Sequence, residues 1–308
     1  MAWMHEEHLP PPPSPTIEVC YRHPSVETRV HCSRCGRPIC PDCMIPAPVG
    51  HQCPTCVEEA RREFRRGAAR GIPAAGITAT KALLIAIVVP FVLEVVLGGP
   101  GALLQAPSGG RLVDMGALQP LLIANGQYWR LFSAMFLHAG LFHILFNGYA
   151  LWLFGSFVES SLGRTRMVLV YFVSGFLASV TSYVWGPVNT VGVGASGAIF
   201  GIFGAFIAYN YRRRHLALAS ANLRWATTLL LLNALLAFTV RGIDWRAHLG
   251  GLVAGVLAGL VAEGVGNAQQ RRLVQVAGFL ALVALGVALV IWRTEQIRAT
   301  PFFQAVFG

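Results

Sequence analysis

Seven long apolar stretches restrict the fold of this chain more than any other feature of its sequence. They lie near residues 81–98, 134–158, 167–186, 194–211, 225–240, 246–264 and 272–292. Of the 308 residues, 55% are hydrophobic and only 12% are charged, which is too apolar for a soluble protein. Stretches of this length can cross a bilayer as helices, and they lack the alternation of barrel strands. The sequence therefore predicts an all-α polytopic membrane protein with seven transmembrane helices.

The distribution of basic residues predicts how these helices are oriented. With the N-terminus in the cytoplasm, eighteen Lys and Arg residues fall on the cytoplasmic side and six on the outer side. This bias follows the positive-inside rule and predicts a cytoplasmic N-terminus and an external C-terminus, in a plasma or inner membrane. The net charge of +10 is thereby explained by topology. We expect membrane lipid, and no nucleic acid, as a partner.

Composition divides the chain into five segments. Residues 1–17 contain LPPPPSP and are predicted to form a disordered, proline-rich tail. Residues 18–58 hold all seven cysteines, and residues 59–79 form a basic linker before the membrane. The arginines of this linker either rest on anionic lipid or serve only as a topology signal. The membrane core is expected at 80–265, with an extra helix and a tail at 266–308.

The cysteine-rich segment is predicted to bind metal. Its ligand pairs are Cys20 and His23, Cys32 and Cys35, Cys40 and Cys43, and Cys53 and Cys56. Two residues between ligands allow both to reach one tetrahedral ion, so the segment supplies ligands for about two structural zinc ions. Disulfides are the alternative, but a cytoplasmic segment is kept reduced.

The short spacings between pairs favour a cross-braced arrangement, in which the first pair joins the third and the second joins the fourth. The segment loosely resembles a B-box or related treble-clef zinc finger, with His31 and His51 as spare ligands. Because no coordination position is left open for chemistry, we expect a stabilising or binding module, with a protein as its possible partner.

Four polar side chains from separate apolar stretches are predicted to lie at a similar depth. Ser196 begins the fourth stretch, and His143 and Asn147 share one helical face near the outer end of the second. His248 lies near the outer end of the sixth. Polar groups in a membrane are costly unless they face partners or water, so together these four residues indicate a functional site.

Glycines on two of the stretches favour a close approach between them. Gly251, Gly255 and Gly259 recur every fourth residue on the sixth stretch, and the fourth carries Gly194, Gly197, Gly201 and Gly204. Packing of these faces would bring His248 to Ser196. Histidine is the usual base that activates serine, and Asp244 is a less favoured candidate to orient it.

At this point the motifs resemble those of the rhomboid family of intramembrane serine proteases. They are GASG at 194–197, His143 followed by Asn147, AHLGGLVAG at 247–255, and Tyr128-Trp129-Arg130, and the resemblance covers about 80–265. It implies a six-helix core, here with one additional C-terminal helix. It further implies a serine endopeptidase that needs no cofactor for catalysis and cleaves transmembrane or juxtamembrane segments of membrane proteins near the outer face of the bilayer.

The resemblance also assigns roles to residues. Ser196 would be the nucleophile and His248 the base, with His143, Asn147 and the Ser196 amide forming the oxyanion hole. Structural positions would be Trp129, Arg130, Glu159, Gly194, Gly197, Gly251 and Gly255.

Two other functions remain open at this stage. One is a catalytically silent rhomboid-like protein that binds membrane proteins or acts as their chaperone. The other is a transporter or channel, which would need acidic residues meeting near the midplane. Glu94 and Glu263 are the candidates for that role, and neither is placed centrally.

Overall fold

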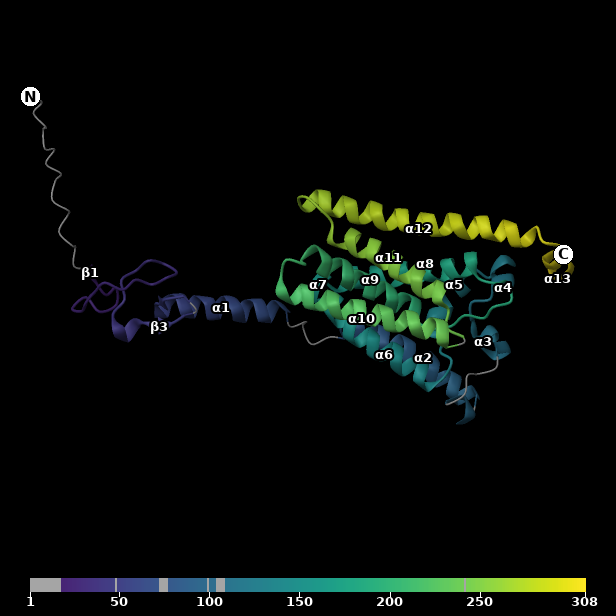
Figure 1. Ribbon diagram of the computed structural model, residues 1–308, viewed down its shortest axis with the longest axis horizontal. Coiled ribbons are helices and arrows are strands. Elements are labelled where there is room, and N and C mark those ends of the chain that lie inside the picture. Colours follow the sequence, from purple (N-terminus) through teal and green to yellow (C-terminus); the bar gives the residue numbers. More distant parts are fainter. Residues whose placement is uncertain (1–17, 48, 72–76, 99, 104–108, 241) are drawn as a thin grey trace, which may run out of the picture. The chain divides into compact units, whose positions relative to one another are not determined.

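A computed structural model describes residues 18–47, 49–71, 77–98, 100–103, 109–240 and 242–308. The chain divides into two compact units, Met1–Gly76 and Ile77–Gly308 (Figure 1). The proline-rich tail predicted for 1–17 lies outside the described residues, as does 72–76 of the predicted linker.

The first unit is small and is built from short elements. Its strands pair as two antiparallel ribbons, and one helix follows them. The elements are β1 (Glu18–Val19), β2 (Glu27–Thr28), the 3₁₀ turn η1 (Pro41–Cys43), β3 (Ile45–Pro46), β4 (His51–Gln52) and α1 (Pro54–Gly71). Because α1 begins at Pro54 and contains Cys56, the cysteine-rich module continues directly into the helix that forms the start of the predicted linker.

The regular elements of the second unit are all helical within its described residues, apart from one isolated β-bridge between Leu118 and Gly192. Its elements are α2 (Ala79–Gly98), η2 (Pro100–Leu103), α3 (Gly109–Met115), α4 (Pro120–Ala124), α5 (Arg130–Ser133), η3 (Ala134–Phe136), α6 (Leu141–Ala150), the π-helical turn η4 (Leu151–Gly155), α7 (Ser156–Leu162), α8 (Arg164–Trp185), α9 (Ser196–Arg212), α10 (Ala217–Thr239), α11 (Trp245–Glu263), α12 (Ala268–Arg298) and α13 (Pro301–Phe307). Each of the seven predicted apolar stretches falls on one of the long helical segments, which confirms the polytopic all-α fold.

Within the described residues, five helical segments are long and apolar enough to cross a membrane. They are Ala79–Leu97, Leu141–Leu162, Arg164–Trp185, Trp245–Glu263 and Ala268–Arg298. The other two predicted spans correspond to α9, which has 17 residues, and α10, which has 23.

The start predicted for the second span, residue 134, is wrong. Residues 134–136 form the separate turn η3, and the helix begins only after Gly140, whose φ of 106° breaks the backbone direction. Apolar composition continues through this break, so hydropathy alone did not reveal it.

The core of the second unit is centred on α8. In the most apolar 18-residue segment of α8, 78% is buried, whereas the figure for α12 is 17%. Helix α12 lies alongside α8 and α11 at the periphery (Figure 1). Three side-chain hydrogen bonds among the described residues fix α12 in place, and one of them runs from Gln275 Nε2 to the carbonyl of Ala262 over 2.7 Å. The hydroxyls of Tyr183 and Thr294 lie 2.9 Å apart, and Arg298 Nε donates to the carbonyl of Ala124 over 2.8 Å.

Helices α9 and α11 approach each other at backbone distance because glycines line the contact. A Cβ added at Gly251 would lie 2.0 Å from the Gly197 carbonyl oxygen, and one at Gly255 would lie 2.0 Å from that of Gly201. Neither position has room for a side chain, so this packing depends on glycine, as the small-residue pattern predicted.

The side chains of Glu159 and Arg130 each join separate segments of the second unit. The Glu159 carboxylate accepts hydrogen bonds from the backbone amides of Ala79 and Thr80, both at 2.8 Å, and from the Thr80 hydroxyl at 2.7 Å. It thereby fixes the start of α2 to α7.

Arg130 is buried and stabilises the loop that contains α3. Its guanidinium donates to the carbonyls of Val113 at 2.6 Å and Ala117 at 3.0 Å, and to Gln127 at 2.7 Å. It also lies 4.7 Å from the centre of the Trp129 ring.

We predict that Gly255→Ala lowers the free energy of unfolding by about 1–3 kcal/mol, because the new methyl group forces α9 and α11 apart. Unfolding of the purified protein in detergent measures the effect. Gly148→Ala on α6 is the matched control, since its Cβ would meet only Leu84 at an ordinary 3.7 Å. Both changes favour helix equally, so equal stabilities would contradict the tight packing.

Candidate active site

Ser196 and His248 lie next to each other at the start of α9 and α11. The distance between His248 Nε2 and Ser196 Oγ is 2.9 Å, and the two residues are 52 positions apart in the sequence. Each lies in the first turn of its helix. The glycine-mediated packing of α9 on α11 therefore brings an imidazole to a hydroxyl at one end of the helix pair, in hydrogen-bonding geometry suited to proton transfer.

The His248 ring is positioned by an aromatic side chain. It stacks on Phe200, with the ring centres 4.3 Å apart and the planes 17° from parallel. Asp244 does not orient it: the carboxylate caps α11 by accepting from the amides of Arg246 and Ala247, and it also accepts from the Ser182 hydroxyl.

Phe200 was not singled out from the sequence. The available signal was its spacing, because it follows Ser196 by four residues and so shares its helical face.

His143 is fixed in one tautomer by its contact with the backbone. The amide of Ala139 donates to His143 Nδ1 over 3.2 Å, so in the neutral ring the proton lies on Nε2. That nitrogen faces Gly194, where an added Cβ would come within 2.7 Å of it. His143 therefore presents a hydrogen-bond donor toward the loop that leads into Ser196.

Asn147 presents a second donor in the same place. It lies one turn after His143 on α6, and its Nδ2 atom is buried without a hydrogen-bond partner among the described residues. A Cβ at Gly194 would lie 3.7 Å from this atom. Gly194 also has a φ of 124°, which a residue with a side chain rarely adopts. Its glycine thus permits both the loop conformation and the approach of the two donors.

Three helix starts meet at this point. Ser196, His248 and His143 belong to the first turns of α9, α11 and α6. The unpaired amides and the dipole of a helix make its N-terminus favourable for negative charge. With the donors of His143 and Asn147, the region beside Ser196 is therefore suited to stabilise an oxyanion.

His138 and Glu94 lie behind His143. The His138 ring is fully buried and meets His143 edge-on, with centres 5.1 Å apart. Glu94 accepts a hydrogen bond from the His138 amide over 3.2 Å. The sequence interpretation passed over His138 and considered Glu94 only as a transport residue. Since Glu263 pairs with Arg212 and Arg213, both acidic candidates have local partners, and they do not meet each other.

Comparison with known proteins places this geometry in a family. The model of the rhomboid domain matches residues 125–263. This range includes the four side chains predicted for the site, namely His143, Asn147, Ser196 and His248. The YdcA protein of Bacillus subtilis (strain 168) is 41% identical over 135 residues, which are 44% of this chain and 67% of that protein. The chain belongs to the rhomboid family. Members of this family are typically intramembrane serine proteases.

Other rhomboid relatives are matched over smaller parts of their length. Rhomboid protease GluP of Bacillus subtilis (strain 168) is 38% identical over 149 residues, 48% of this chain and 28% of that protein. Rhomboid-like protease 1 of Toxoplasma gondii is 36% identical over 161 residues, 50% of this chain and 54% of that protein.

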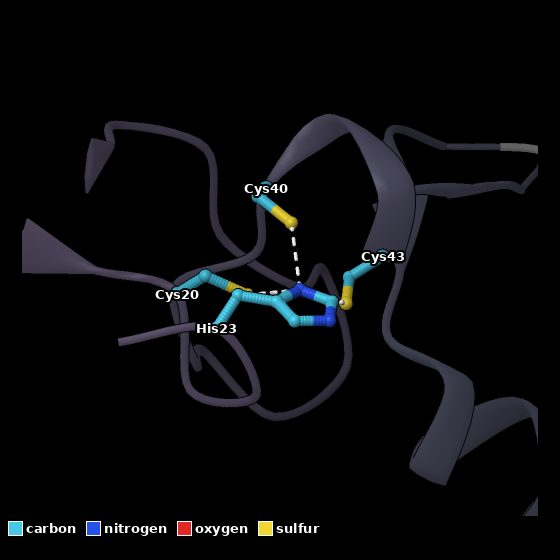
Figure 2. Close-up of side chains that lie close together, drawn as sticks. All are labelled: Cys20, His23, Cys40 and Cys43. Atoms are coloured by element: carbon cyan, nitrogen blue, oxygen red, sulfur yellow. Dashed lines mark hydrogen bonds between the residues drawn. The ribbon is translucent and has the colours of Figure 1, made fainter. Parts of the chain in front are cut away.

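The first unit of this rhomboid contains two clusters of potential metal ligands. Cys20, His23, Cys40 and Cys43 form one, shown in Figure 2, and Cys32, Cys35, Cys53 and Cys56 form the other. Within each cluster the ligand atoms lie within 4.8 Å of one another. The first pair joins the third and the second joins the fourth, which is the interleaved arrangement that the spacings predict. His31 instead contacts Glu18, and all seven cysteines are free thiols.

The distances in the clusters fit a tetrahedral ion. His23 Nδ1 lies 3.2 Å from Cys40 Sγ, 3.5 Å from Cys43 Sγ and 3.9 Å from Cys20 Sγ. Bonds of about 2.0–2.3 Å to one tetrahedral metal place its ligand atoms roughly 3.3–3.8 Å apart. The first cluster is therefore close to the geometry that coordination requires, and in the second the Sγ atoms of Cys35 and Cys53 lie 3.8 Å apart.

The ionisation of the thiols also favours a cation. Burial by itself raises the pKa of Cys20, but hydrogen bonds with the backbone of Arg22, Cys40 and His23 outweigh it and lower this pKa to about 6. Burial and neighbouring thiols raise the pKa of Cys43 to about 11 and that of Cys56 to about 12. A divalent ion supplies the positive charge that allows all the sulfurs of a cluster to bind as thiolates.

We predict that the purified full-length protein contains two metal ions per chain, measured by elemental analysis. Replacing Cys32 and Cys53 together with serine removes one ion, because the other cluster keeps all its ligands. His31→Ala and His51→Ala are the controls and retain both ions. Loss of metal in these controls, or none in the wild type, would contradict the assignment.

Proposed function

We propose that this rhomboid is an active intramembrane serine endopeptidase that cleaves transmembrane or juxtamembrane segments of membrane proteins near the outer face of the bilayer. The observation that carries the proposal is the 2.9 Å contact between Ser196 Oγ and His248 Nε2. A hydroxyl is a poor nucleophile until a base removes its proton, and this contact puts the base within reach.

In the proposed reaction His248 accepts and returns one proton. As Ser196 Oγ bonds to the carbonyl carbon of the substrate, its proton passes to His248 Nε2, which requires that the neutral ring carry its own proton on Nδ1. The imidazolium then gives a proton to the departing amine, and an acyl-enzyme ester remains on Ser196. A water molecule then attacks this ester while His248 accepts its proton. The proton returns to Ser196 Oγ, and the product with the new carboxyl group leaves.

Each attack places a negative charge on the carbonyl oxygen of the substrate, and this oxyanion needs hydrogen-bond donors that are already in place. We assign this role to His143 Nε2–H, Asn147 Nδ2 and the Ser196 amide. The support is the Ala139 contact that fixes the His143 tautomer, and the buried Asn147 amide that has no other partner within the described region. Removing one such donor typically costs about 100- to 1,000-fold in rate.

The proposal also covers the orientation in the membrane and the metal of the first unit. The bias of basic residues supports a cytoplasmic N-terminus and an external active site, in a plasma or inner membrane. For the clusters of the first unit we propose zinc, because three thiolates with one imidazole, or four thiolates, are its usual structural ligands. This module then serves as a stabilising element or as a binding site for a protein partner.

We predict that Ser196→Ala and His248→Ala each reduce cleavage of a model transmembrane substrate in liposomes by at least about 1,000-fold, because each removes one half of the proposed pair. The control is Ser160→Ala, because the exposed Ser160 hydroxyl bonds only to the Phe157 carbonyl within the described region. Robust cleavage by purified Ser196→Ala would refute the assignment of Ser196 as the nucleophile. A wild type that folds, binds the substrate and never cleaves it would favour the silent binding protein.

We further predict that Gly194→Ala reduces the cleavage rate by about 100-fold or more, because the new Cβ displaces the His143 donor. Gly192→Ala in the same loop is the matched control, since its Cβ would meet only Leu118 at 3.6 Å. The cleavage rate per folded molecule is the measurement. Equal rates in the two variants would contradict the role of His143.

A further inference from the structure

A second, chemically different site lies at the other end of α9 and α11. An open cavity of about 420 Å³ is lined by four arginines, Arg166, Arg212, Arg213 and Arg271, together with Glu263 and Tyr209, among others. Ser196 begins α9 and Arg212 ends it, so the cavity lies roughly 25 Å from the candidate active site. Nothing in the proposed reaction uses these residues.

The cavity carries an excess of positive charge. Its one carboxylate, Glu263, contacts Arg212 at 3.0 Å and also Arg213. Among the described residues, Arg166 donates only to the carbonyl of Leu162, at 3.3 Å. The Arg271 side chain has no hydrogen bond or ion pair within the described part of the chain. With four guanidinium groups against one carboxylate, the lining has a formal net charge of +3.

Local structure holds Arg213 in place and leaves room for Arg271 at the cavity. Arg213 donates to the Tyr209 carbonyl over 3.0 Å and lies 3.6 Å from the centre of its ring. Gly264 has a φ of 64°, and a Cβ there would come within 2.5 Å of Arg271 Cγ, so the glycine leaves space for that side chain. The positive-inside rule explains why basic residues lie on this face, but not why α8, α12 and the end of α9 direct them into one cavity.

The depth of the cavity identifies the class of its ligand. Candidate membrane spans end at Leu162 and Glu263 and begin at Arg164 and Ala268, all beside the cavity. Span ends lie at the level of the lipid headgroups, where basic pockets between helices recognise anionic lipid. Guanidinium groups pair well with phosphate oxygens, often through two parallel hydrogen bonds.

We propose that this cavity binds the phosphate of an anionic phospholipid. Arg166 and Arg271, which are not committed to Glu263, contact the phosphate directly, while Arg212 and Arg213 supply further positive charge. The bound headgroup links the ends of α8, α9 and α12, and it therefore stabilises the helix that carries Ser196. This inference does not rest on the proposed protease activity.

The test uses the purified full-length protein in a neutral detergent. Phosphatidylglycerol, phosphatidylcholine or inorganic phosphate is added, and native mass spectrometry and the midpoint of thermal unfolding report binding. The double variant Arg166→Gln/Arg271→Gln alters the lining. Arg224→Gln/Arg272→Gln is the matched control, with the same loss of charge at exposed positions outside the cavity.

We expect phosphatidylglycerol, but not phosphatidylcholine, to bind and to raise the unfolding midpoint of the wild type and the control. Binding to the lining variant should be roughly twenty-five-fold weaker, since each of the two basic residues near a membrane surface contributes about fivefold. If the double variant fails to fold, Arg271→Gln alone serves, because this side chain is exposed and has no hydrogen bond or ion pair within the described residues.

Two results would overturn the proposal. Equal binding of phosphatidylglycerol to the lining variant and the control would show that the cavity is not the site. An equal rise in the midpoint with inorganic phosphate would show that the ligand is a soluble phosphate and not a lipid.

Discussion

The contact between α9 and α11 is the interaction on which the candidate active site depends. These helices carry Ser196 and His248 near their N-termini, and a 2.9 Å hydrogen bond between the two forms only if the helix axes are very close. In lipid, burial of apolar surface gives little drive for helices to associate, so close van der Waals packing of small residues must supply it. Glycine at positions 251 and 255 allows backbone to meet backbone. Packing and chemistry therefore share one cause in this part of the molecule.

The features that sequence predicted are those that leave a periodic or local signal. Apolar stretches identified the long helices, cysteine spacing indicated both ligand clusters, and the glycine repeat with His248 indicated its approach to Ser196. The features that the sequence could not predict depend on contacts between distant segments. The stacking of Phe200 on His248, the burial of His138 behind His143 and the hydrogen bond from the Ser182 hydroxyl to Asp244 exist only once the chain is folded. The start of α6 was misplaced because hydropathy does not register a single turn of backbone.

The two units are stabilised by different means. The second has an extended core of packed helices around α8, whereas the buried cluster described in the first consists of Ile39 and six of the seven cysteines. A unit so small buries too little apolar surface to fold on that basis alone, and metal coordination is the common substitute. Its ligand clusters are thus the counterpart of the hydrophobic core of the membrane unit.

The bond between Arg298 and the Ala124 carbonyl joins residues that are 174 positions apart. A ribosome adds about 5–20 residues per second, so roughly 10–35 seconds of synthesis separate the two partners. During that interval α4 exists without α12, and the segment that follows α3 lacks this anchor. Final assembly of this face must therefore follow synthesis of the last helix, which gives the order of translation a direct bearing on when the molecule reaches its mature form.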